Sequence, residues 1–85
     1  MFILATFNNR THALQFSNKL KSDGVGVKII NMPREISSSC GLSVMFNYQY
    51  LNIARSIIAN NRFASFRGFY LKKNNGNMFV YEKIN

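Results

Sequence analysis

The chain has 85 residues, of which 47% are hydrophobic and 14% aromatic, so it is long enough for one folded domain and too apolar for a disordered segment. Its 11 Lys and Arg against 3 Asp and Glu give a net charge of +8, which favours anionic partners. The apolar runs are far shorter than the roughly 20 residues of a membrane-spanning helix, so we expect no membrane insertion. We predict a single domain over residues 1–85, and the absence of a secretory signal and of a second cysteine predicts a cytoplasmic location.

The first third of the chain predicts a strand, a helix and a second strand. Phe2–Phe7 is a β-favouring apolar run before the turn residues Asn8 and Asn9, which is typical of a buried central strand with a neighbour on each edge. From Thr11 the apolar residues recur at helical spacing, and Gly24 predicts the end of that helix. The β-branched run Val25–Ile30 predicts a short strand ending before Pro33.

The remainder predicts a loop, a strand, a second helix and a hairpin. Residues 33–41 have no period and contain three consecutive serines, which favour a loop. Apolar residues alternate from Leu42 to Phe46, as in a strand with one buried face. Residues 50–61 have helical spacing, and the aromatic runs 66–73 and 78–84 flank the hairpin signal Asn75-Gly76.

This order, β-α-β-β-α-β with an additional C-terminal strand in a hairpin, predicts an α+β ferredoxin-like sandwich with an antiparallel sheet and two helices on one face. In that topology the loop between the second and third strands lies at the same end as the start of the first helix. Cys40 and Thr11 are therefore expected to be neighbours.

Cys40 is the only cysteine and the first candidate for chemistry. A helix start presents unpaired N–H groups and about half a positive charge, which stabilise a thiolate, and Arg10, His12 and Arg34 add positive potential. The alternative is a buried cysteine that acts as a small hydrophobic residue. Both interpretations stay open from the sequence.

The neighbours of Cys40 predict a cradle for an anion. Gly41 permits a positive φ and the close approach of a ligand, and the backbone amides of Ser38, Ser39 and Gly41 suit an anion-binding nest together with Ser37. Arg34 is either a thiolate partner or a surface ion-pair residue, and His12 either pairs with Cys40 or is exposed. Other Cys, His and carboxylate ligands are scarce, so we predict no metal and no cofactor.

The segment Pro33-Arg34-Glu35-Ile36-Ser37-Ser38-Ser39-Cys40-Gly41-Leu42, with Thr6-Phe7 before a helix, resembles the selenium/sulfur carrier-like family of small bacterial domains. The resemblance implies a carrier that holds sulfur or selenium on Cys40 as a persulfide or selenosulfide and exchanges it with donor and acceptor proteins. Arg34, Ser37 to Ser39 and Gly41 would form the cradle. It also implies a carrier rather than an independent enzyme.

Two rival functions follow from the charge and the aromatic residues. Arg67-Gly68-Phe69-Tyr70-Leu71-Lys72-Lys73 interleaves aromatic and basic residues, a pattern that suits stacking on unpaired bases of a nucleic acid but is more typical of a core strand. The terminal hairpin also suits a noncatalytic module that docks a protein partner or forms a homodimer.

Overall fold

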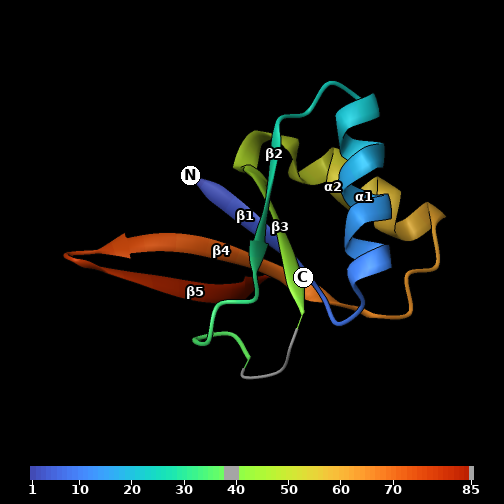
Figure 1. Cartoon of the computed structure of the whole chain (residues 1–85). Coiled ribbons are helices and arrows are strands. Elements are labelled where there is room, and N and C mark those ends of the chain that lie inside the picture. Colours follow the sequence, from blue (N-terminus) through green and yellow to red (C-terminus); the bar gives the residue numbers. More distant parts are fainter. Residues whose placement is uncertain (38–40, 85) are drawn as a thin grey trace.

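The computed structural model describes residues 1–37 and 41–84, and it has two helices on one face of a five-stranded antiparallel sheet (Figure 1). The elements in chain order are β1 (Phe2–Phe7), α1 (Arg10–Ser22), β2 (Val27–Asn31), β3 (Leu42–Asn47), the short 3-10 helix η1 (Tyr48–Tyr50), α2 (Leu51–Asn60), β4 (Phe66–Asn75) and β5 (Met78–Ile84). The α+β class is therefore confirmed.

The central position of β1 is confirmed by its pairing on both edges. The strand order is β2-β3-β1-β4-β5, and each neighbouring pair is antiparallel. Phe2 pairs with Asn47 of β3 on one side and with Lys72 of β4 on the other. Only a strand that is apolar on both faces suits this place, and five of its six residues are fully buried.

The main core lies between the sheet and the helices. Ile3, Ala5 and Phe7 alternate along β1 and join the buried cluster that includes residues of both helices. The ring of Phe7 is at the centre of an aromatic group, with ring centroids 5.3 Å from Phe16 and 5.4 Å from Phe66. These contacts fasten α1 to the end of β1.

Both ends of α1 follow from local chemistry. The side chain of Asn9 accepts a hydrogen bond from the backbone N–H of His12 at 3.1 Å, which caps the first turn. Gly24 has a φ of 82°, and the Val25 N–H donates to the Leu20 carbonyl at 3.0 Å. The predicted stop at Gly24 is confirmed, because this left-handed conformation suits glycine.

Several element boundaries differ from the predicted ones by one or two residues. The second strand begins at Val27 because the backbone of Val25 caps α1. Tyr50 belongs to η1, directly before α2. The first hairpin strand runs to Asn75 and not to Lys73, because pairing continues to the residue beside the two-residue turn, whereas the second begins at Met78 as predicted. Among the described residues, neither helix is long and apolar enough to cross a membrane.

Candidate functional site

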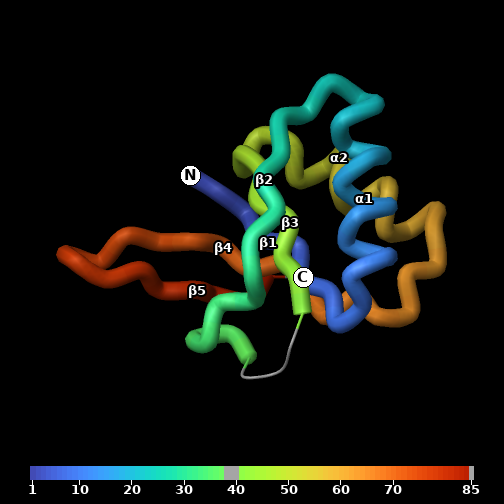
Figure 2. The backbone as a smooth tube through the Cα atoms, viewed as in Figure 1, coloured from blue at the N-terminus to red at the C-terminus, as the bar shows by residue number. Residues whose placement is uncertain are grey.

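Residues 32–37, which follow β2, lie against the face of the sheet opposite the two helices, which we call the open face (Figure 2). The backbone N–H groups of Ile36 and Ser37 donate to the Pro33 carbonyl at 3.0 and 3.1 Å and close a turn. Met32 is buried, and its sulfur accepts a hydrogen bond from the Ser43 hydroxyl at 3.6 Å. This turn therefore forms a small second layer on the open face.

Gly41 is where the chain rejoins the sheet beside the end of β1. The Met32 N–H donates to the Gly41 carbonyl at 3.2 Å, and the next residue, Leu42, pairs with Phe7. A Cβ at Gly41 would stand 2.5 Å from the Phe7 carbonyl oxygen. Gly41 does not adopt a positive φ, so the expectation of one is corrected: glycine is needed here because the backbone of β1 approaches closely.

Three predicted site residues, Ser38, Ser39 and Cys40, lie outside the described residues. The described chain resumes at Gly41, next to Phe7, and only Asn8 and Asn9 separate Phe7 from the start of α1. The neighbourhood of Cys40 and Thr11 stays a prediction.

A cavity of about 170 Å³ adjoins the turn on the open face, and we call it the basic pocket. Its lining comes from β1, the turn, β4 and β5: Thr6, Asn8, Met32, Ile36, Ser37, Arg67, Tyr70 and Lys83. Two of these residues, Arg67 and Lys83, are cationic, and no acidic residue is among the described lining. The pocket therefore suits a small anion, because its two fixed charges have the same sign.

The strand register brings the two cations together. The pairing of β1 with β4 shifts between Thr6 and Phe7, which leaves Arg67 as the additional residue of a bulge. Lys83 pairs with Tyr70 across the hairpin, and its Cε lies 2.9 Å from where a Cβ at Gly68 would stand. The missing Cβ of Gly68 leaves room for the Lys83 side chain, and its φ of 135° is a second reason for glycine at this position.

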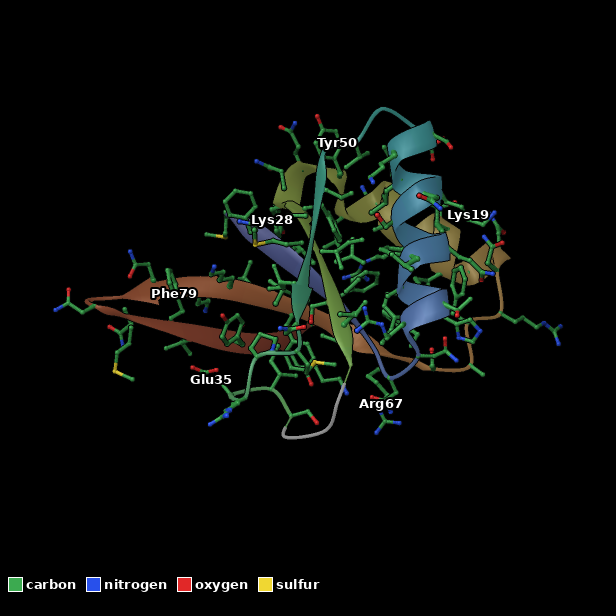
Figure 3. All side chains as sticks on the ribbon, in the orientation of Figure 1. Lys19, Lys28, Glu35, Tyr50, Arg67 and Phe79 are labelled. Carbon is green, nitrogen blue, oxygen red and sulfur yellow. The ribbon has the colours of Figure 1, made fainter. Side chains whose placement is uncertain are left out.

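One acidic residue lies near this end of the open face. Glu35 belongs to the turn, and in Figure 3 it lies at the same end of the sheet as Arg67. Partial burial, with a smaller contribution from the Glu35 carboxylate, raises the pKa of Tyr81 above its ordinary value of 10.0. The folded chain therefore holds the phenol proton more tightly than the unfolded chain does.

The raised pKa of Tyr81 in the folded chain predicts a loss of folding stability at alkaline pH. The contribution of Tyr81 to stability is fully present below pH 10.0 and is lost as the pH rises through the raised pKa, because the unfolded chain ionises first. We expect Tyr81→Phe to lose less stability than the native chain between about pH 9 and about pH 11, measured as urea midpoints. Glu35→Gln should reduce the difference. An equal loss in the native chain and Tyr81→Phe would contradict the assignment.

The other predicted supporting residues lie at two places around the loop. Ser37 lines the basic pocket. Arg34 is exposed on the turn and is not part of the lining. Arg10 and Thr11 are exposed at the start of α1, where Asn9 already caps the His12 N–H. The described residues thus bring Ser37, but not Arg34, to the pocket.

His12 is held by residues that precede β4. Its Nδ1 lies 2.7 Å from the Ser65 hydroxyl oxygen, and its ring centroid is 5.6 Å from that of Phe63. The pairing of His12 with Cys40 stays a prediction. Within residues 1–37 and 41–84, no three His, Cys, Asp or Glu side chains lie close enough together to hold a metal ion.

Sequence reasoning did not assign Lys83 and Tyr70 to the site, and it assigned Arg67 only to a nucleic-acid surface. The hairpin signal Asn75-Gly76 predicts the turn but not its register: the turn in the structure is Gly76-Asn77, one residue later, and this turn pairs position 70 with position 83. The bulge at Arg67 has no such local signal.

Comparison with known proteins identifies a family. Residues 2–70 match the model of a family described as "Putative Se/S carrier protein-like". The match spans β1 to the middle of β4, and it includes the turn and Gly41. No curated protein and no solved structure matches the chain.

Proposed function

Because the chain belongs to the Se/S carrier protein-like family, we propose that it carries sulfur or selenium on the thiol of Cys40 and passes the atom to a partner protein. The observation that carries the proposal is the basic pocket beside the loop that contains this cysteine. Ser37 belongs both to the loop and to the pocket, so the chain's connectivity supports an anion on the loop lying near Arg67 and Lys83.

The proposed transfer consists of two nucleophilic displacements. The Cys40 thiolate attacks the outer sulfur of a donor persulfide, a new S–S bond forms, the donor S–S bond breaks, and the donor leaves as a thiolate. An acceptor thiolate then attacks the outer sulfur of the Cys40 persulfide, and Cys40 leaves as a thiolate. With a donor selenosulfide, the transferred atom is selenium: an S–Se bond to Cys40 forms, the donor S–Se bond breaks, and the donor again leaves as a thiolate.

The basic pocket would supply the electrostatic part of this function. A thiolate and a persulfide anion are both stabilised by nearby cations, so Arg67 and Lys83 would lower the pKa of the Cys40 thiol. Ser38, Ser39 and Gly41 would add backbone N–H groups, and Arg34 on the turn and Thr11 at the start of α1 would add to the stabilisation from outside the pocket lining. The chain would have no turnover of its own, since the donor and the acceptor supply the remaining chemistry.

We also infer a narrower fold class for this single domain. Strands β1 and β2 are parallel to each other with β3 between them, and β4 lies on the other side of β1. This split β-α-β arrangement supports a ferredoxin-like sandwich to which β5 is added as an outer strand. We assign the carrier to the cytoplasm, where reducing conditions keep a lone thiol free.

The test is intact-protein mass spectrometry of reduced protein treated with a persulfide donor or with selenite plus a thiol. We expect an increase of about 32 or about 80 daltons in the native chain, absent in Cys40→Ser. Arg67→Gln should slow both loading and alkylation of Cys40 by iodoacetamide. Lys73→Gln is the matched control, because it removes one charge from a residue outside the basic pocket.

Two results would contradict the proposal in different ways. A Cys40 that alkylates readily but forms no adduct with either donor is a reactive thiol without carrier function. A Cys40 that resists alkylation in the folded chain is a structural cysteine. Equal rates in Arg67→Gln and Lys73→Gln would remove the basic pocket from the mechanism while leaving carriage by Cys40 intact.

A further inference from the structure

The open face of β1, β4 and β5 presents aromatic side chains between lysines. Strand pairing aligns Phe2 with Lys72 and Lys72 with Tyr81, and it aligns Tyr70 with Lys83, so these side chains share one face. Phe79 follows the same face of β5, two residues before Tyr81. We call this set the aromatic-lysine face: Phe2, Tyr70, Lys72, Phe79, Tyr81 and Lys83.

The outer part of this face is exposed because the hairpin extends beyond β1 (Figure 1). The last β4 residue paired with β1 is Lys72, so residues 73–75 and 78–80 have no third strand of the described chain beside them. Phe79 is 51% exposed and Phe2 is 44% exposed. Exposed aromatic rings on one face of a sheet, here on β1 and on β5 with β4 between them, are typical of a binding surface.

The ring of Phe79 already holds a cation. The Nζ of Lys72 lies 4.1 Å from the Phe79 ring centroid. This face of the ring therefore points to the surface and accepts a charged group. A base stacked on Phe79 would displace the lysine. Since the lysine side chain is flexible, its ammonium group would then be free to contact the phosphate of the same nucleotide.

The charge distribution favours a polyanion. The chain has three acidic residues: Asp23 caps the end of α1, Glu82 pairs with Lys73 at 2.8 Å, and Glu35 lies on the turn near Tyr81. The alternation of the strands puts Lys73 and Glu82 on the face opposite to Lys72. The aromatic-lysine face therefore carries cations that no acidic residue of its own strands neutralises.

We infer that the aromatic-lysine face binds a single strand of RNA, a function beyond sulfur or selenium carriage. Bases stack on Phe79, Tyr81 and Phe2, while Lys72 and Lys83 contact phosphates. The phenol groups of Tyr70 and Tyr81 offer partners for the 2′-hydroxyl, which favours RNA over DNA. A second copy of the chain fits this face less well, because a protein interface would bury lysines among the rings without a counter-charge.

The test is fluorescence anisotropy with a labelled uridine RNA of about 12 nucleotides, titrated at several salt concentrations. We expect the full chain to bind this strand about tenfold more tightly than a duplex RNA of equal length, because only unpaired bases stack on the rings. Phe79→Ala should weaken binding about fivefold or more. The exposed position of Phe79 leaves the fold intact, which circular dichroism checks.

Lys72 and Lys73, which are adjacent in β4, provide a matched pair of variants for this test. Lys72→Ala should weaken binding and lower the slope of log affinity against log salt by about one. Lys73→Ala makes the same change of net charge on the opposite face and should have a much smaller effect. Cys40→Ser should bind RNA normally, which separates this inference from the proposed carrier function.

Four results would overturn the inference. Equal losses in Lys72→Ala and Lys73→Ala would mean attraction by net charge alone. Equal affinity for the duplex would exclude stacking, and equal or tighter binding of the matching thymidine DNA would exclude RNA as the occupant. Concentration-dependent dimers in light scattering that Phe79→Ala abolishes would assign the face to a second copy of the chain.

Discussion

Phe7→Ala should lower the free energy of unfolding by about 3–5 kcal/mol, a large part of the roughly 5–15 kcal/mol of a small domain. Phe7 is fully buried at the end of β1, and its ring lies 5.3 to 5.9 Å from the rings of Phe16, Phe63 and Phe66. Its removal leaves a cavity that β1, α1 and the start of β4 all border. These elements cannot close it without breaking the pairing of the central strand.

Urea unfolding followed by circular dichroism measures this loss, and Phe79→Ala is the matched control. It removes the same side chain from a position that is 51% exposed, so we expect a change within about 0.5 kcal/mol. Similar losses for the two variants would mean that the hairpin packs as tightly as the core, contrary to the exposure of Phe79.

Gly41→Ala should destabilise the chain by about 1–3 kcal/mol although it adds a single methyl group. The new Cβ would stand 2.5 Å from the Phe7 carbonyl oxygen, which is backbone in the central strand and cannot move aside as a flexible side chain does. The clash forces β3 away from β1 at the first residue pair after the loop. The new Cβ would also stand 3.1 Å from the Cε of Met32, a residue that lines the basic pocket.

Gly26→Ala is the matched control for this prediction. A Cβ at Gly26 would meet no atom within 4 Å beyond its chain neighbours, and the residue has no positive φ, so alanine fits there. We expect Gly26→Ala to be neutral or to stabilise by about 0.4–1 kcal/mol, because alanine restricts the unfolded chain. Thermal unfolding of both variants compares them directly, and a Gly41→Ala variant as stable as the native chain would show that β1 and β3 separate at little cost.

The sequence determined the elements because their signals are local. The apolar run Phe2–Phe7 predicts a strand buried on both faces, and the structure puts it at the centre of the sheet. Gly24 predicts the end of α1 through a conformation that glycine adopts freely. Strand boundaries at Val25 and Asn75 were less well predicted, because pairing and capping depend on backbone partners elsewhere in the chain.

The sequence also selected the loop that contains Cys40, since three serines without a period are a local loop signal. It did not select the surroundings of that loop. Ser37, Arg67 and Lys83 are far apart in the chain and line one pocket only because β1, β4 and β5 are neighbours in a particular register. A shift of one residue would turn Lys83 to the opposite face.

For the aromatic rings of β5 too, the sequence determined one property and the tertiary structure another. Alternation by itself determined that Phe79 and Tyr81 share a face, and aromatic content favoured a core strand for residues 67–73. Only the tertiary structure decided which positions are covered: Phe69 lies under the helices and is 4% exposed, while Phe79 lies where the hairpin extends beyond β1 and is 51% exposed. The physical reason is that period-2 alternation defines two faces of a strand, and the packing of distant helices decides which of them becomes the core.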